Sequence, residues 1–315
     1  MKLPELRIGN LVAPVPIIQG GMAVKLSTAP LAAAVANEGG IGIIAGTGMS
    51  IEELREEIRK AKEMTKGIIG VNVLFAAREF ANLVKAAIEE GIDLVVSGAG
   101  FSRDMFTWGK ESGVPIVPIV SSSRLAKLAE KMGAAAVVVE GKEAGGHLGT
   151  DESMREILPE VKAAVHIPVI AAGGVVDGQD IVEAFRLGAD GVQMGTRFAA
   201  SVESNASPEV KELYVKASHA DVVLVKSPVG LPGRGLRNEF SAKINQGQEE
   251  PISKCTGCLK HCGRNYCIME ALCNATDQGN FRNALVFSGE FIDKIKEILP
   301  VKEIFRRLLT EVEKA

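Results

Sequence analysis

The sequence predicts a (β/α)8 barrel, in which eight parallel strands close into a cylinder surrounded by helices. Short apolar runs alternate with amphipathic helical patterns eight times along the 315-residue chain. These runs are apolar throughout, which is typical of parallel strands covered on both faces. Their starts repeat roughly every 20 to 33 residues, the length of one β-turn-α-turn unit. An open doubly wound sheet is the alternative, but it would need a reversal of strand order that is not visible in the sequence.

The predicted strands follow one another along the first two thirds of the chain. They are residues 16–20, 42–46, 68–74, 94–98, 115–120, 136–141, 168–172 and 191–195. Amphipathic helices lie between them, such as residues 50–65 and 123–132, and Ser50 is placed to cap the first of these, three residues before Glu53. Several helices are expected to end on a glycine with left-handed backbone, namely Gly39, Gly91, Gly113, Gly133 and Gly188.

The periodic pattern divides the chain into three parts. Residues 1–220 are expected to form the barrel, and residues 288–315 a helical segment that packs back on it. Residues 221–287 break the period and are expected to form an irregular cap. All five cysteines lie in this cap, within 19 residues of one another. A disulfide framework would spread them through a small secreted chain, so this segment has chemistry of its own.

Composition excludes several classes of protein. Apolar residues make up 46% of the chain, which is too many for a disordered protein. The formal charge of −3 and the aromatic content of 4% argue against a nucleic-acid-binding surface. No stretch is apolar for the roughly 18 residues that a membrane span needs, and the N-terminus does not resemble a signal peptide. We therefore expect a soluble cytoplasmic protein that acts on a small molecule.

Small residues follow the predicted strands, at the end of a barrel where active sites are built. Their backbone N–H groups would lie open to a bound molecule. The ends of strands seven and eight form the usual phosphate site of such barrels, and Thr196 adds a hydroxyl there. No GxGxxG motif follows a strand and no Walker motif occurs, which disfavours a dinucleotide fold or nucleotide hydrolysis. The candidate ligand-binding residues are Gly21, Met22, Asn72, Ser121, Ala144, Gly145, Ala172, Gly173, Gly174, Gly195 and Thr196.

His147 is the candidate catalytic residue. It follows a strand end inside a glycine-rich loop, EAGGHLG, and imidazole is the side chain best suited to proton transfer near neutral pH. His166 precedes strand seven at the opposite end of the barrel, and His219 lies at a helix end. Both are expected to be structural.

Several segments resemble the nitronate monooxygenase family, formerly called 2-nitropropane dioxygenase, which includes the flavin-dependent enoyl-ACP reductase. The similar segments are IIQGGM (17–22), LAAAVANEGGIGII (31–44), GVNVL (70–74), EGKEAGGHLG (140–149), IPVIAAGG (167–174) and GVQMGTRFAASVES (191–204). The resemblance implies a barrel that holds FMN noncovalently. It places Gly21, Met22 and Asn72 beside the flavin, with Ala144 and Gly145 along it. Gly173, Gly174, Gly195 and Thr196 would hold the phosphate, and His147 would act as a base or hydrogen-bond donor.

The resemblance implies an oxidoreductase and leaves its reaction open. The leading hypothesis is a nitronate monooxygenase that oxidises alkyl nitronates with O2. The alternatives are an NAD(P)H-dependent enoyl-ACP reductase or quinone reductase on the same scaffold, and a noncatalytic flavin or cluster sensor. A sugar-phosphate lyase or isomerase without flavin would use the same phosphate site. A homodimer is expected from the family alone.

The cysteines are spaced C-x2-C-x3-C-x4-C-x5-C. Four thiolates can close a structural Zn²⁺ site or hold a [4Fe–4S] cluster. The set Cys255, Cys258, Cys262 and Cys273 is similar to the cluster loop of the 2,4-dienoyl-CoA reductase group, in which a cluster would pass single electrons to FMN. The alternative is a cap of reduced thiols without metal, packed around Tyr266, Ile268 and Leu272.

Overall fold

A computed structural model describes residues 1–250, 252, 255–276 and 280–315. Eight parallel strands in this part of the chain close into a barrel, which confirms the predicted (β/α)8 fold. Each strand begins and ends within one residue of its predicted bounds. In order around the barrel the strands are β3 (Ile17–Gln19), β4 (Ile41–Ala45), β5 (Ile68–Leu74), β6 (Leu94–Gly98), β7 (Ile116–Val120), β8 (Val137–Glu140), β10 (Val169–Ala172) and β11 (Gly191–Met194).

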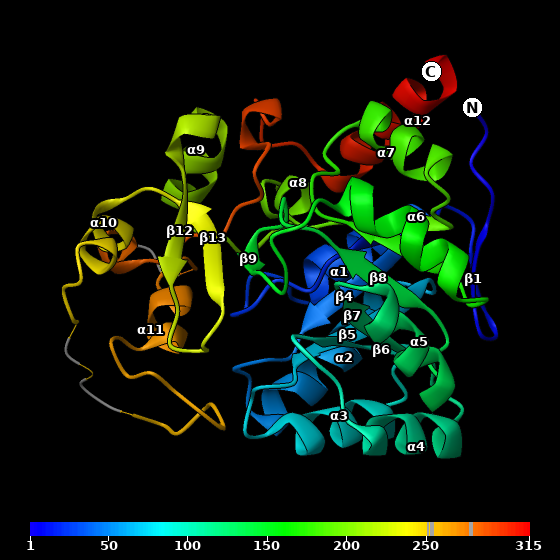
Figure 1. The fold of residues 1–315 in the computed structure, drawn as a ribbon, viewed down its shortest axis with the longest axis horizontal. Helices are drawn as coiled ribbons and strands as arrows, with labels where there is room; N and C mark the ends of the chain where they lie inside the picture. The colour runs from blue at the N-terminus through cyan, green and yellow to red at the C-terminus, as the bar shows by residue number, and fades with distance from the viewer. Residues whose placement is uncertain (251, 253–254, 277–279) are drawn as a thin grey trace.

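Helices follow the strands and cover the outside of the barrel (Figure 1). They are α1 (Ala29–Asn37), α2 (Ile51–Met64), α3 (Phe80–Glu89), α4 (Arg103–Ser112), α5 (Ser123–Met132), α6 (Met154–Ala164) and α7 (Gly178–Arg186). Ser50 caps α2 as predicted, because its hydroxyl accepts the Glu53 N–H at 3.1 Å. The five glycines predicted to follow helices all have positive φ, between 72° and 102°. The left-handed backbone there is the one that glycine adopts without steric cost.

The C-terminal helix α12 (Val301–Lys314) fills the eighth outer position. Strand β11 is followed only by the short helix α8 (Thr196–Ala199), and α12 packs between α7 and α1. Its apolar face joins the main core through Val301, Ile304, Phe305, Leu308 and Val312. The ring of helices is therefore completed by the far end of the chain. No helix among the described residues is long and apolar enough to cross a membrane.

A hairpin of β1 (Leu6–Ile8) and β2 (Leu11–Ala13) precedes the barrel. Its buried residues pack against inward-facing barrel residues such as Ile18 and Val138. The hairpin therefore covers one end of the barrel interior. It was not predicted, because strands of three residues are too short to show a period.

The segment expected to be irregular contains regular elements. Strands β12 (Val222–Lys226) and β13 (Pro232–Leu236) form an antiparallel hairpin, and β9 (Gly146–His147) pairs with β13. Helix α9 (Pro208–Lys216) precedes this hairpin, and α10 (Glu239–Asn245) and α11 (Ile268–Cys273) follow it. Figure 1 shows these elements as a second layer beside the barrel. Antiparallel strands joined by a tight turn do not follow the barrel period, which is why the sequence pattern breaks here.

Candidate active site

A cavity of about 240 Å³ lies at the carboxyl ends of the barrel strands, where the cap meets the barrel. Its lining includes all but one of the predicted ligand-binding and catalytic residues, namely Gly21, Met22, Asn72, Ala144, Gly145, His147, Ala172, Gly173, Gly174, Gly195 and Thr196. Ser121 does not line it. The Ser121 hydroxyl donates to the Gly149 carbonyl at 3.3 Å, because the chain turns at this point into α5, which Ser122 caps.

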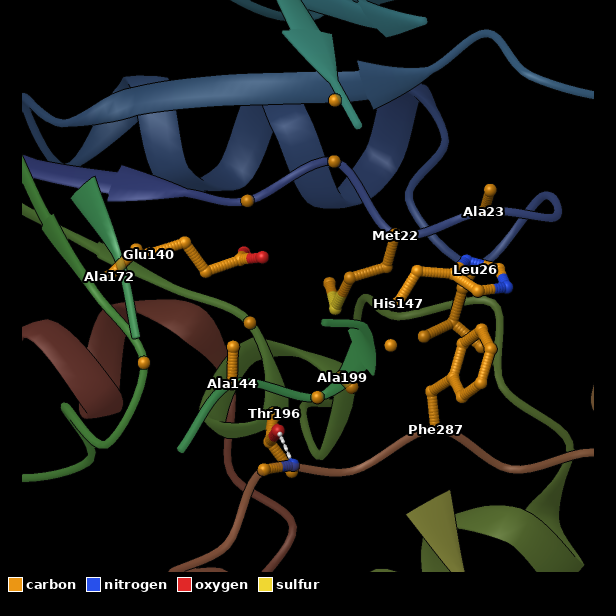
Figure 2. Close-up of a pocket in the computed structure, with 18 of the residues that line it drawn as sticks. Met22, Ala23, Leu26, Glu140, Ala144, His147, Ala172, Thr196, Ala199 and Phe287 are labelled. Atoms are coloured by element: carbon orange, nitrogen blue, oxygen red, sulfur yellow. Dashed lines mark hydrogen bonds between the residues drawn. The ribbon is translucent and has the colours of Figure 1, made fainter. Parts of the chain in front are cut away.

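The loop after β3 is held in place by buried side chains. The Gln19 side-chain carbonyl accepts the Ile43 N–H at 3.1 Å, and its amide donates to the Ser27 hydroxyl at 3.0 Å. The Ser27 hydroxyl in turn accepts the Met22 N–H at 2.9 Å. These bonds tie the loop to β4 and fix Met22 at the edge of the cavity, where Figure 2 shows its side chain pointing inward.

Two amide side chains bring unpartnered polar atoms to the cavity. The Asn72 amide donates to the Gly21 carbonyl at 3.1 Å, while Asn72 Oδ1 is buried without a hydrogen bond. Gln193 Oε1, on β11, is also buried and unpartnered. A buried acceptor without a partner costs free energy, so these two atoms mark where a bound molecule would supply N–H donors. Gly21 must be glycine here, because a Cβ at this position would lie 2.4 Å from the Asn72 Cβ.

Backbone N–H groups gather at the ends of β10 and β11. Gly173 and Gly174 both have positive φ, at 92° and 74°. Gly195 has an ordinary φ of −102°, and a Cβ there would touch only the Met22 sulfur, at 3.9 Å. The space beside Gly195 is therefore kept open by the missing side chain. The Thr196 hydroxyl accepts the Gly289 N–H at 2.9 Å, which brings a segment from beyond the cap to the same place.

The loop that carries Ala144 and Gly145 is anchored by Glu143. Its buried carboxylate accepts the Ser153 hydroxyl at 2.5 Å and the Met154 N–H at 3.0 Å. Its backbone carbonyl accepts the Glu290 N–H at 3.0 Å. Gly145 passes so close to the Ser288 backbone that a Cβ would lie 2.6 Å from it. The loop is thus held between α6 and the segment that follows the cap.

His147 lies on β9, where the barrel loop pairs with the hairpin of the cap. Its Nε2 is 2.7 Å from the Ser227 hydroxyl, and its ring meets Phe287 edge to face at 5.2 Å. Burial lowers the pKa of His147 to about 4, because the cavity wall does not solvate an imidazolium. The imidazole is therefore neutral at pH 7. Figure 2 shows His147 and Phe287 together on one side of the cavity.

Glu140 reaches the cavity from the opposite side, at the end of β8 (Figure 2). Burial raises the pKa of Glu140 to about 7. The carboxyl group is thus close to half protonated at neutral pH, and its protonated form can donate a hydrogen bond. We did not predict Glu140 or Gln193, although both stand at the ends of predicted strands and could have been found there.

The cap supplies an apolar wall, which includes Leu259, Ile268 and Leu272. Backbone hydrogen bonds hold it on the loop after β5: the Arg78 N–H donates to the Cys258 carbonyl and the Lys260 N–H to the Ala76 carbonyl, both at 2.9 Å. The cysteine-rich segment therefore forms part of the cavity wall. This role could not be predicted from the sequence, because the segment is far from the barrel strands along the chain and contacts them only in the folded structure.

The charged side chains that line the cavity, among the described residues, are all carboxylates. They are Glu140, Glu143 and Glu290, and the neutral His147 adds no positive charge. Backbone N–H groups at the ends of β10 and β11 can hold an anion, whereas the apolar wall that the cap supplies offers none of its own charge to one. The apolar wall therefore fits an uncharged, apolar group.

The five cysteines are free thiols, and none lines the cavity. Within the described ranges, which include all five, no group of three or more His, Cys, Asp or Glu side chains is arranged to hold a metal ion. The set Cys255, Cys258, Cys262 and Cys273 is therefore not brought together as a metal centre in this structure. Cys255 and Cys262 are exposed, whereas Cys273 ends α11.

Comparisons with known proteins agree with this architecture. A model of the nitronate monooxygenase family matches residues 7–311. The chain belongs to the nitronate monooxygenase family. This family consists of oxidoreductases, as the motifs in the sequence imply.

Relatives within the family carry different names. A (3aS,4S,5R,7aS)-5-hydroxy-7a-methyl-1-oxo-octahydro-1H-indene-4-carboxyl-CoA dehydrogenase of Mycobacterium tuberculosis is 35% identical over 235 residues, which are 74% of this chain and 66% of that protein. The match thus spans slightly less than two thirds of that relative. A "probable nitronate monooxygenase" of Staphylococcus saprophyticus is 32% identical over 79% of this chain and 83% of its own length. The structure of FabK from Thermotoga maritima is 38% identical, with a TM-score of 0.86 over 95% of this chain and 93% of that one.

Proposed function

We infer that the protein is an FMN-dependent oxidoreductase that reduces an uncharged, apolar substrate with NAD(P)H, of the kind that an enoyl thioester represents. One observation carries this proposal. The described lining of the cavity combines an apolar wall with carboxylates and contains no cationic side chain. An alkyl nitronate is a small anion, and burying it against the apolar wall, away from the backbone N–H groups that could hold a phosphate, would be costly.

The residues present fit FMN. Asn72 Oδ1 and Gln193 Oε1 are unpartnered acceptors, and one of them suits the N3–H group of an oxidised flavin ring. The open backbone at Gly173, Gly174 and Gly195 suits its phosphate. When bound, FMN would supply the redox chemistry between NAD(P)H and the substrate.

His147 would assist by hydrogen bonding. As a neutral imidazole it has one N–H donor, which can polarise a substrate carbonyl and later supply a proton. The edge of Phe287 and the bond to Ser227 hold the ring in place. The apolar wall on α11 excludes water from the acceptor, so that the hydrogen bond acts in a low-dielectric environment.

Nitronate oxidation is the second candidate. It is supported by the family to which the chain belongs and by the name of the staphylococcal relative. In that reaction an alkyl nitronate would be oxidised with O2, and His147 could also take the proton from a neutral nitroalkane.

Two assays on the flavin-loaded protein separate the candidates. One follows NADH oxidation with an enoyl thioester, and the other follows O2 consumption with an alkyl nitronate. We expect the first to have the larger kcat/KM.

His147→Ala should keep its flavin and lower kcat by about 10²- to 10⁴-fold, the usual contribution of a proton-transferring group. The exposed His166→Ala serves as control. Faster turnover of the nitronate would overturn the proposal.

A further inference from the structure

The contact between His147 and Ser227 joins two elements that are 80 residues apart in the sequence. His147 belongs to β9, and Ser227 begins the turn between β12 and β13. The pairing of His147 with Gly233 on β13 holds the two side chains in register. The 2.7 Å bond between Nε2 and the hydroxyl is therefore built into the three-stranded sheet.

A second hydroxyl lies next to Ser227. Tyr266, in the cysteine-rich segment, is 1% exposed, and its hydroxyl is buried without a hydrogen bond as the atoms are placed. Burial raises the pKa of Tyr266 to about 12, and the nearby Ser227 hydroxyl opposes this shift. An edge-to-face contact with Phe240, at 5.3 Å, fixes the ring. Ser227 is the side chain whose hydrogen bonding acts on the Tyr266 hydroxyl, and it already bonds His147.

The numbers of donors and acceptors determine which group donates in each hydrogen bond from Tyr266 through Ser227 to His147. The Ser227 oxygen already accepts the Val229 N–H, at 3.3 Å, which leaves it one lone pair and one O–H. If the Tyr266 O–H donates to that lone pair, the Ser227 O–H is free to donate to His147 Nε2, and every donor is used. If Nε2–H donated to Ser227 instead, the buried Tyr266 O–H would have no acceptor. Buried donors are rarely left unpaired, so the first arrangement is favoured.

We propose that Ser227 and Tyr266 are positioning residues that hold His147 in the tautomer with its proton on Nδ1. Nε2 is then occupied as an acceptor, and Nδ1 makes no hydrogen bond with any described residue. The nitrogen that remains for a substrate is a donor, not a base. The tautomer assignment rests on the donors and acceptors of these three side chains, whereas the donor role toward a substrate carbonyl rests on the proposed function.

NMR of the flavin-loaded protein with ¹⁵N-labelled histidine reports the tautomer directly, without turnover. His147→Gln identifies the His147 signals, and the exposed His166 and His219 act as internal references. We expect the two ring nitrogens of His147 to show a protonated Nδ1 and an unprotonated Nε2 at pH 7. A protonated Nε2, or an even mixture of tautomers, would overturn the proposal.

Variants test whether the hydrogen bonds from Tyr266 through Ser227 to His147, here called the relay, set the tautomer. Ser227→Ala should shift His147 toward a mixture of tautomers, and Tyr266→Phe, which keeps the ring, should do the same. Ser227→Thr keeps the hydroxyl and should retain the wild-type signals. His147 signals that stay unchanged in Ser227→Ala and Tyr266→Phe would contradict the relay. If Ser227→Ala does not fold, the His147 signals of Tyr266→Phe and Ser227→Thr are compared instead. A shift in Tyr266→Phe but not in Ser227→Thr would support the proposal, and no shift in Tyr266→Phe would contradict it.

Turnover adds an independent measurement. We expect Ser227→Ala to lower kcat by about 10- to 100-fold, the range found when a metal-binding histidine loses the hydrogen bond that orients it. KM and flavin content should change little. If the NMR result holds but no enoyl thioester is reduced, the proposed function fails and the tautomer assignment stands. If the thioester is reduced and Ser227→Ala matches the wild type in both tautomer and kcat, the positioning role fails.

Discussion

Glu140 is the carboxyl group whose protonation should couple stability to pH. Burial raises its pKa from the ordinary 4.5 to about 7. Between these values the folded protein keeps a proton that the unfolded chain has lost, so the free energy of unfolding falls as the pH rises through this range. Glu140→Gln has no carboxyl group at this position, so its unfolding free energy should not fall in this way as the pH rises. We expect the variant to gain stability relative to the wild type between pH 5 and pH 8.

Urea unfolding of both proteins at pH 5 and pH 8 measures this difference. His147 also titrates in acid, but it is present in both proteins and its effect cancels in the comparison. A difference in unfolding free energy that is the same at the two pH values would show that Glu140 is not held protonated by burial.

Most of the predicted ligand-binding and catalytic residues line the cavity, because each follows a barrel strand. His147 and the glycines of β10 and β11 are found in this way. Ser121 also follows a strand but turns toward Gly149, since the side chain's direction depends on where α5 begins. Ser227 and Phe287 could not be predicted, because they reach His147 only through the pairing of β9 with the cap hairpin.

At the scale of elements, the turn from β11 into α8 is the clearest test of the phosphate site. Gly195→Val places a side chain in open space with an ordinary φ, near only the Met22 sulfur. We expect the variant to fold with an unchanged urea midpoint and to lose most of its flavin. Flavin content, measured by absorbance after gel filtration, checks this. An unchanged flavin content in Gly195→Val would show that the phosphate does not bind beside Gly195.

Gly174→Val is a poorer probe of the same site. Gly174 has positive φ, and its Cβ would lie 2.9 Å from the Phe291 ring. The substitution would strain the fold whether or not a cofactor binds. We therefore expect Gly174→Val to lower the urea midpoint, in contrast to Gly195→Val.

Helix α11 should set the preference for chain length. Leu272→Ala removes part of the apolar wall, and each methylene that loses its burial costs about 0.8 kcal/mol, or about fourfold in affinity. We expect KM to rise for long-chain enoyl thioesters and to stay nearly constant for short ones. Leu224→Ala, at an exposed position on β12, is the matched control. An equal rise in KM for both lengths would show that α11 does not contact the substrate chain.

Elements of the barrel could be predicted closely because a strand covered on both faces is apolar throughout. The β1–β2 hairpin and the cap hairpin lack such a pattern, since their strands are short and partly exposed. The cysteine spacing left a metal site and a cap of reduced thiols open. The structure uses this segment as a wall, and no metal-binding group is brought together among the described residues.

In the whole molecule, the site depends on pieces that are distant in the sequence. The barrel provides the glycine-lined floor, and the cap provides the apolar wall. The end of the cap brings Phe287 to the cavity, and the segment after it brings Gly289 before α12 completes the ring of helices. Because these parts share one cavity, its charge and its apolar surface belong to the assembled fold and not to any single motif.

An anaerobic absorbance spectrum of the purified protein, recorded before and after addition of NADH, distinguishes the enoyl reductase from the nitronate monooxygenase. We expect the bands of bound FMN, which should bleach rapidly with NADH and return when an enoyl thioester is added without oxygen. A flavin that NADH bleaches only slowly, but that an alkyl nitronate reduces, would contradict the proposed reductase and support nitronate oxidation.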